Sequence, residues 1–177
     1  MAAAPVARPR TTRRVTDGSR YEEFSDSDRE FLARSEFAVC VATFYEDLAE
    51  RLQNGAVEGF ALGGVTPASI QTFEVPGAFE LPFAAKACAE SGSFAGIACL
   101  GVVIRGETSH YDHVCDGVAL GLQKAQLDTG VPCAFGVITA ENMEQAEARS
   151  GGGKRDQGRG AAVVAMRMAL LVRGLAG

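Results

Sequence analysis

From residue 37 onward, short apolar runs take turns with longer stretches in which apolar residues recur every three or four positions. Short runs rich in β-branched and aromatic residues are typical of buried strands, and the longer spacing predicts helices. The predicted strands are residues 37–43, 69–75, 97–104 and 131–139, and the predicted helices are residues 44–63, 79–89, 110–128, 141–149 and 161–175. Strands that alternate with helices pair in parallel through right-handed crossovers. We therefore expect an α/β protein, a three-layer α/β/α sandwich whose four-stranded, mainly parallel sheet carries helices on both faces.

Residues 1–34 differ from the rest of the chain. The stretch Met1–Thr16 contains four arginines, two prolines and no acidic residue. This composition favours a basic N-terminal arm that is flexible or docked on a neighbour, although an Arg-rich start is also typical of an organellar transit peptide. Ser25–Asp28 supplies capping residues for a short helix that runs through Arg34. The domain itself is expected to span residues 35–177.

Composition narrows the class of protein. With 177 residues and 47% hydrophobic residues, the chain is long enough for one domain with a substantial core. A net charge of −5 argues against a nucleic-acid-binding surface. No apolar run approaches the roughly 20 residues that a membrane span needs, so we expect neither nucleic acid nor a membrane as a partner.

The five cysteines form no CxxC pair, and most lie inside apolar runs. A reduced cysteine in such a run behaves as a small hydrophobic residue. This usage argues against a metal site or a disulfide framework, and it favours a reducing compartment, the cytoplasm. A plastid is the alternative if the N-terminus is a transit peptide.

Residues suited to ligand binding follow several of the predicted strands. In open parallel sheets, ligands bind beyond the carboxyl ends of the strands. The expected ends are residues 44–46, 77–80, 102–110 and 135–142. Phe44 and Phe79 are suited to hold a flat heteroaromatic ring between them, and Glu80 to accept hydrogen bonds from sugar hydroxyls or ring N–H groups.

The stretch Gly101–His113 combines two kinds of chemistry. A buried strand ends in a small-residue turn at Gly106, and a helix is predicted to begin near His110. The free N–H groups of a helix N-terminus favour an anion, above all a phosphate. A histidine in the same turn exchanges protons readily near neutral pH. The stretch therefore predicts a phosphate site beside a proton-transfer group.

Each of these residues also has a plainer interpretation. A phenylalanine at a strand end belongs to the core more often than to a site, and a carboxylate such as Glu80 suits any helix N-terminus. His110 is equally compatible with a capping or core role, and Arg105 with an ion pair to an acidic neighbour. His110 and His113 are two ligands only, and Asp112 faces another side of the helix, so we expect no metal. Their convergence on one rim of the sheet favours a site.

Three segments, in this order, resemble the lumazine synthase family: VPGAFELP at 75–82, GVVIRGETSHYD at 101–112 and FGVITAEN at 135–142. The resemblance covers about residues 37–175 and is far more specific than a single glycine motif. It implies a flavodoxin-like fold and a transferase of riboflavin biosynthesis that needs no cofactor. Such an enzyme makes 6,7-dimethyl-8-ribityllumazine from 5-amino-6-(D-ribitylamino)uracil and 3,4-dihydroxy-2-butanone 4-phosphate, with release of phosphate and water.

For the pyrimidine substrate, the resemblance implies contacts from three strand ends: Phe44, Ala78, Phe79, Glu80, Val102, Val103 and Ile104. Phe44 would stack on the pyrimidine, and Glu80 would lie on the ribityl side. The backbone of residues 102–104 would line a slot for the ring.

For the second substrate, the resemblance implies that Glu107 and Thr108 offer turn N–H groups and a hydroxyl to the phosphate, which Arg149 also meets. His110 would transfer protons. Phe135 would complete the pocket from a neighbouring subunit, so the active sites would lie between subunits of a homo-oligomer.

Two positions depart from the family pattern. Tyr45 stands where a small polar residue or a histidine is common, and its phenol would replace that hydrogen bond while narrowing the ribityl groove. Arg159 stands where a lysine is common before Gly160, and a supporting role is expected for it, with Lys154 as the alternative.

Residues 150–157 look about two residues longer than in relatives that form icosahedral shells, which suggests a pentamer or a decamer. Association with riboflavin synthase is a further expectation from the resemblance. A flavin or lumazine carrier without catalysis and a structural shell protein remain as alternatives. A flavodoxin-like regulator would carry acidic clusters at its strand ends, and the predicted ends have none.

Overall fold

A single sheet organises the chain in the computed structural model, which describes residues 21–151 and 155–176. Its strands are β1 Phe37–Ala42, β2 Ile70–Val75, β3 Gly96–Ile104 and β4 Cys133–Ala140. They lie in the order β2-β1-β3-β4, and each neighbouring pair is parallel. The prediction of a four-stranded parallel sheet is confirmed.

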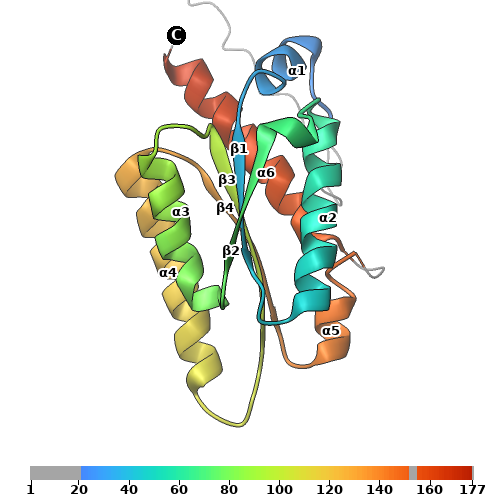
Figure 1. The fold of residues 1–177 in the computed structure, drawn as a ribbon, viewed down its shortest axis with the longest axis vertical. Helices are drawn as coiled ribbons and strands as arrows, with labels where there is room; N and C mark the ends of the chain where they lie inside the picture. The colour runs from blue at the N-terminus through green and yellow to red at the C-terminus, as the bar shows by residue number, and fades with distance from the viewer. Residues whose placement is uncertain (1–20, 152–154, 177) are drawn as a thin grey trace, which may run out of the picture.

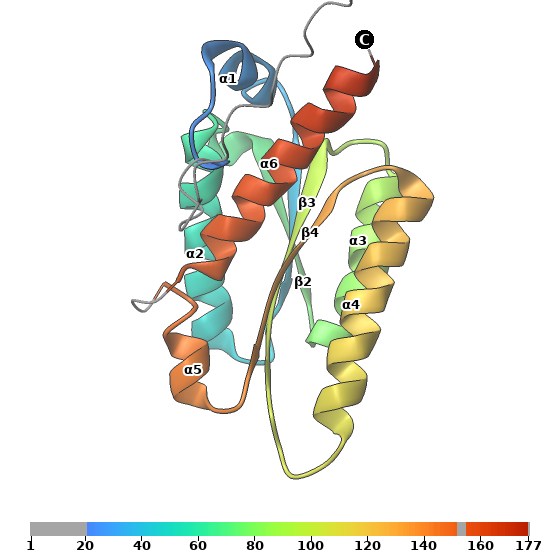
Figure 2. The ribbon, with the colours of Figure 1, turned by 180° about the vertical axis from the view of Figure 1, so that it is seen from behind.

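Helices cover both faces of this sheet (Figure 1). They are α1 Asp26–Leu32, α2 Glu46–Leu62, α3 Leu81–Glu90, α4 His110–Thr129, α5 Met143–Glu147 and α6 Gln157–Ala176, with the short 3₁₀ turns η2 Pro67–Ser69 and η3 Ala78–Glu80. Seen from behind, α3 and α4 still lie together on one side of the sheet, and α2 and α6 on the other (Figure 2). The three-layer α/β/α sandwich is therefore confirmed. Within the described ranges, no helix has the length and apolar character needed to cross a membrane.

Two hydrophobic layers hold the sandwich together. All six residues of β1 are buried, as expected for a central strand whose two faces are both covered. One layer packs Leu52 and Phe60 of α2 and Met166 of α6 on the sheet. The other packs Leu81 of α3 and Val118 of α4 on the opposite face. Because the strands are parallel, their carboxyl ends lie at one edge of the sheet, and the loops that follow them lie there too.

The helix bounds differ from the prediction at two ends that matter for the site and the core. The helix α2 begins at Glu46, two residues after the predicted start at 44, so Phe44 and Tyr45 lie in the loop after β1. The last helix begins at Gln157, four residues before the predicted start at 161. Gly158 therefore lies inside a helix, where a Cβ would overlap the carbonyl oxygen of Leu52. The glycine serves the close contact between α2 and α6 and does not mark a loop.

The described part of the predicted N-terminal arm packs on this chain's own domain. Ser25 caps α1 through a capping box with Asp28, as the sequence predicts, and Leu32 is fully buried. Arg167 of α6 donates hydrogen bonds to the carbonyl oxygens of Tyr21 and Glu23. Phe24 and Leu32 belong to the same hydrophobic cluster as Met166 of α6. The expectations of a basic arm or transit peptide in residues 1–20 lie outside the described residues.

Candidate active site

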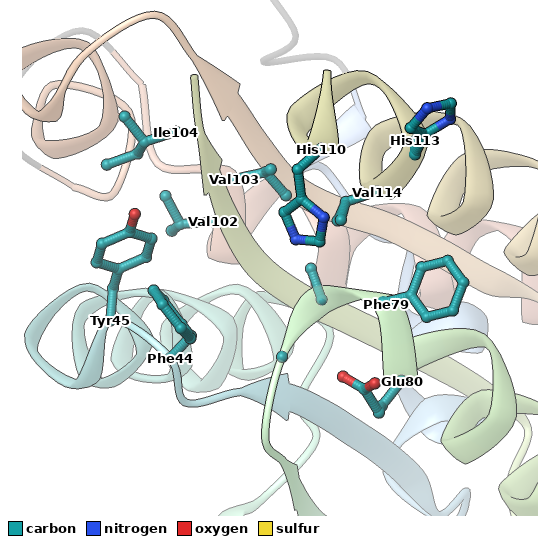
Figure 3. A pocket seen from close by; sticks show the side chains of 12 residues that line it. Phe44, Tyr45, Phe79, Glu80, Val102, Val103, Ile104, His110, His113 and Val114 are labelled. Atoms are coloured by element: carbon teal, nitrogen blue, oxygen red, sulfur yellow. The ribbon is translucent and has the colours of Figure 1, made fainter. Parts of the chain in front are cut away.

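A pocket of about 560 Å³ opens at the carboxyl ends of β1 and β3. The chain leaves β1 toward α2 on one face of the sheet and leaves β3 toward α4 on the other face, which makes this edge the switch point of the topology. Such points are the preferred ligand sites of open α/β sheets. The pocket is lined by Phe44, Tyr45, Gly77, Ala78, Phe79, Glu80, Val102, Val103, Ile104, His110, His113 and Val114 (Figure 3).

The register of the strands creates a slot along the end of β3. The pairing of β1 with β3 stops at Val41 and Leu100, whereas β3 continues to pair with β4 as far as Ile104 and Ala140. Residues 102–104 thus have a neighbouring strand on the β4 side, and their other edge faces the pocket. Backbone N–H and C=O groups along that edge suit the edge of a flat heterocycle, which would continue the sheet in place of a strand.

Two phenylalanines at the rim of the pocket are left largely uncovered. Phe44 is 72% exposed and Phe79 is 59% exposed. The ring of Tyr45 supports Phe44 edge-on, with their centroids 5.0 Å apart. Uncovered aromatic rings that flank a concave, mostly apolar pocket are typical of a ligand platform.

Small residues on α4 allow η3 and α3 to come close to it. A Cβ on Gly117 would lie 2.7 Å from Cε2 of Phe79, and a Cβ on Gly121 would lie 2.7 Å from Cβ of Pro82. These glycines are four residues apart and so face the same side of the helix. The sequence thereby places Phe79 against α4, on the same side of the pocket as His110.

The turn from β3 to α4 lies beside the slot. Residues 106–109 are all exposed, and α4 begins at His110, as predicted. Ser109 precedes the helix without a capping hydrogen bond from its side chain, and the backbone N–H of His110 donates to the Thr108 hydroxyl oxygen at 3.4 Å. The backbone N–H groups of Asp112 and His113 donate to the Ser109 carbonyl oxygen at 3.1 and 3.3 Å, so an anion would be met mainly by the N–H groups of the exposed turn before α4. In such a site, Glu107 would act through its backbone N–H, because its carboxylate would repel an anion.

Arg105, at the start of this turn, makes the ion pairs that the plainer interpretation proposes. Its guanidinium contacts Asp112 of α4 at 3.1 Å and Glu141 after β4 at 2.9 Å. The hydrogen bond to Glu141, followed by the one to Asp112, raises the pKa of Arg105 above its ordinary value.

Five predicted residues do not line this chain's own pocket: Glu107 and Thr108 lie in the turn beside it, and Phe135, Arg149 and Arg159 lie elsewhere. Phe135 pairs with Cys99, five residues before the end of β4, which is roughly 16 Å at 3.3 Å per residue. The prediction that Phe135 lies at the carboxyl edge of the sheet is therefore wrong. In its own chain, Phe135 lines a separate cavity of about 180 Å³. Arg149 follows α5 and donates a hydrogen bond to the Gln145 carbonyl oxygen. Arg159 of α6 pairs with Glu22 at 2.9 Å, and the alternative Lys154 lies outside the described residues.

The pocket also contains three residues that the predicted set lacks: Gly77, His113 and Val114. His113 and Val114 follow His110 by three and four positions, so they lie on the same face of α4. The helical spacing was the signal that could have found them.

The described residues contain no group of three or more His, Cys, Asp or Glu side chains placed to hold a metal ion. The five cysteines are free, and four of them are buried: Cys40, Cys88, Cys99 and Cys133. Burial is the main cause that raises the pKa of Cys88 and of Cys133 to about 12. Thiols with such pKa values are poor nucleophiles near neutral pH, and none of the four lines the pocket.

An open parallel sheet whose switch point holds a pocket with two uncovered phenylalanines and a histidine defines an α/β protein suited to bind a small molecule. A family model described as 6,7-dimethyl-8-ribityllumazine synthase matches residues 34–173. The chain belongs to this family.

Two proteins named 6,7-dimethyl-8-ribityllumazine synthase illustrate the similarity. The one from Salinibacter ruber (strain DSM 13855 / M31) is 40% identical over 141 residues, which are 80% of this chain and 90% of that protein. The one from Syntrophus aciditrophicus (strain SB) is 43% identical over 137 residues, which are 77% of this chain and 89% of that protein. The similarity extends over nearly the whole length of both relatives and includes the pocket.

Proposed function

We propose that the pocket at the ends of β1 and β3 is the active site of a 6,7-dimethyl-8-ribityllumazine synthase. The enzyme is a transferase of riboflavin biosynthesis that condenses 5-amino-6-(D-ribitylamino)uracil with 3,4-dihydroxy-2-butanone 4-phosphate. The observation that carries the proposal is the slot along residues 102–104, which opens between Phe44 and the histidine-bearing start of α4. An assay with both substrates and the pure protein tests it.

The pyrimidine ring is proposed to lie in the slot along residues 102–104. Its edge would exchange hydrogen bonds with the backbone of Val102, Val103 and Ile104, and its face would stack on Phe44. Ala78 and Phe79 would enclose it from η3. Glu80, at the end of the same turn, would accept hydrogen bonds from the ribityl hydroxyls, and the Tyr45 phenol would narrow the ribityl groove.

The butanone phosphate would lie beside the ring, with its phosphate at the turn before α4. N–H groups of Glu107 and Thr108 and the Thr108 hydroxyl are the donors available there. The substrate amine attacks the butanone carbonyl and gives an imine with loss of water. Phosphate then leaves, the ring closes, and a final dehydration yields the lumazine.

Each of these steps moves a proton, and His110 is the side chain suited to carry it between the two substrates. The amine of the substrate is itself the nucleophile, so the protein needs no nucleophilic side chain. Much of the rate would come from holding two substrates face to face, which converts a bimolecular encounter into an intramolecular one.

A second copy of the chain would complete the site. No lysine or arginine is among the described residues that line the pocket, although a substrate phosphate must be held there. Arg149 and Phe135 lie outside the pocket of their own chain, so they are available to contact the pocket of a neighbouring subunit. We therefore propose a homo-oligomer in which these two residues complete the adjacent pocket, and in which Arg149 stabilises the charge of the leaving phosphate.

Mixed oligomers test this sharing. The variants His110→Ala and Arg149→Ala are each expected to be impaired, and Arg149→Ala raises the KM for the butanone phosphate more than the KM for the pyrimidine. When the two impaired subunits are unfolded together and reassembled, some sites combine an intact His110 with an intact Arg149 from the neighbour. Activity above that of either variant reassembled alone supports shared sites. No recovery in demonstrably mixed oligomers contradicts them.

The assembly is proposed to be a pentamer or a decamer that stops short of an icosahedral shell. The basis is the length of residues 150–157, of which 152–154 lie outside the described residues. A sedimentation or mass-photometry peak near about sixty subunits would contradict it. A reducing cytoplasm is the proposed compartment because the five cysteines are free. Association with riboflavin synthase would pass the lumazine product to the next enzyme.

A further inference from the structure

Arg105 joins three elements that frame the proposed phosphate turn. It follows the last residue of β3, and its backbone N–H donates to the carbonyl oxygen of Ala140, the last residue of β4, at 2.9 Å. Its side chain reaches the first turn of α4 and the turn between β4 and α5. The residue therefore contacts the segments that follow β3 and β4 at this end of the sheet.

The guanidinium uses both its edges and its face. Nη1 contacts Asp112 Oδ1 at 3.1 Å, and Nε contacts Glu141 Oε2 at 2.9 Å. The Cζ atom lies 4.1 Å from the centroid of the Tyr111 ring. A planar cation with donors along its edges can make all three contacts at once. A lysine ammonium is a point charge and cannot reproduce this combination.

These contacts hold α4 on the side that faces away from the pocket. At about 100° per residue, His110 and Val114 point to one side of the helix, Tyr111 points sideways, and Asp112 points to the back. His110, His113 and Val114 line the pocket, whereas Tyr111 and Asp112 do not. Arg105 thus contacts α4 through Tyr111 and Asp112, on the side away from the pocket, and leaves the space for the substrates open.

The contacts of Arg105 with α4 are important because the turn between β3 and α4, residues 106–109, has little packing of its own. Residues 106–109 are exposed, and a Cβ at Gly106 would have no neighbour within 4 Å. The position of His110 relative to the slot on residues 102–104 is therefore set by what fixes the two ends of this turn. Arg105 is at one end and contacts the first helical turn at the other.

We propose that Arg105 is a positioning residue, which fixes His110 and the first turn of α4 against the ring slot through its contacts with Asp112, Glu141 and Tyr111. The inference rests on the proposed function and deepens it. A change at Arg105 is therefore expected to lower kcat and to leave pyrimidine binding in the slot unchanged. The reason is that the slot is formed by β3 of the sheet and does not depend on α4.

The test compares Arg105→Gln and Arg105→Lys with the wild-type enzyme, using kcat, both KM values and the stoichiometry of pyrimidine binding. Arg105→Gln is expected to lower kcat by about tenfold to a hundredfold, the range that a misplacement near 1 Å produces. Arg105→Lys is expected to recover only part of this loss. Pyrimidine is expected to bind to the same number of sites as in the wild type. The matched control is Arg34→Gln, which removes an exposed ion pair with Glu30 on α1 and should leave kcat unchanged.

A double-mutant comparison separates positioning from general damage. If Asp112 acts through Arg105, the double variant Arg105→Gln, Asp112→Asn is no slower than Arg105→Gln alone. Three outcomes would each overturn the inference. The losses of kcat in the two single variants could multiply in the double variant, or Arg105→Gln could lose binding sites in proportion to its loss of kcat. The third is a kcat of Arg105→Gln within twofold of the wild type. Added guanidinium ion at a concentration too low to unfold the protein is expected to restore part of the turnover of an Arg105→Ala variant, and sodium chloride of equal ionic strength is not.

The outcomes for the wild type keep the two proposals apart. A wild type that makes no lumazine overturns the proposed function and this inference with it. An active wild type whose Arg105→Gln variant is equally active overturns the inference alone.

Discussion

The ring of Phe79 rests on the backbone of Gly117, where a Cβ would lie 2.7 Å from Cε2 of the ring. A glycine inside a helix is costly by about 1 kcal/mol relative to alanine, so its presence in α4 reflects this contact. The contact sets where one of the two uncovered aromatic rings stands at the pocket. A backbone position on one element thus determines a side-chain position on another.

The variant Gly117→Ala should therefore separate stability from ligand binding. The added Cβ favours the helix but pushes the Phe79 ring, which is 59% exposed and free to move, away from its place at the rim. We expect the free energy of unfolding to stay within about 1 kcal/mol of the wild type. We expect the Kd for the pyrimidine to rise several-fold, measured by titration calorimetry. Gly174→Ala, where a Cβ on α6 would meet nothing within 4 Å, is the control that should not change the Kd. An unchanged Kd in Gly117→Ala would contradict the role of Phe79.

Gly158→Ala should damage the core. A Cβ at this position would overlap the Leu52 carbonyl oxygen, which is backbone and cannot rotate away. The helices α2 and α6 would have to separate, at an expected cost of about 1–3 kcal/mol or more. Denaturant unfolding measures this loss. The comparison with Gly174→Ala removes the helix-propensity effect, and equal stability of the two variants would contradict the proposed close contact.

His110→Ala should lower kcat while the pyrimidine still binds. The imidazole lines the pocket from the first residue of α4, whereas the slot for the ring belongs to β3. We expect a loss of about tenfold or more in kcat, since general acid–base groups typically contribute at least that much. Residual activity above the uncatalysed rate is expected because the two substrates are still held together. Weaker pyrimidine binding with an unchanged kcat at saturation would contradict the role of His110.

The buried thiols predict how stability depends on pH. Burial raises the pKa of Cys88 and Cys133 to about 12 from an ordinary value of 9.0, so the folded chain keeps protons that the unfolded chain loses. Their contribution to stability is complete below pH 9 and is lost as the pH rises toward 12. The expected slope is roughly a kcal/mol per pH unit for each thiol. Urea unfolding of the wild type and Cys133→Ala across this range should show a smaller slope in the variant. Identical slopes would contradict the assignment.

The sequence was sufficient for the sheet and for most of the pocket. Strand ends are encoded locally, because an apolar run stops where a glycine or a proline follows, as at Pro76 and Gly106. In a parallel sheet these ends meet at one edge, so Phe44, Glu80 and His110 could be predicted to share a site. Each of the three lines the pocket.

The features that the apolar and polar pattern could not predict depend on contacts between segments that are distant in the sequence. Gly158 looked like part of a loop because its role is a contact with α2, which no local spacing reveals. Phe135 lies well before the end of β4, so its predicted place depended on a second subunit that one chain does not describe. The network around Arg105 joins residues 36 positions apart, and the sequence alone offered only the general expectation of an acidic partner.

The most direct measurement records lumazine and inorganic phosphate together, in one reaction of the pure protein with ribitylaminouracil and the butanone phosphate. The proposed function predicts that both products appear at equal rates, well above those in buffer alone, and that His110→Ala slows both. Pyrimidine that binds to the wild type without any increase in lumazine over the uncatalysed rate would contradict the proposal and favour a ring-binding carrier.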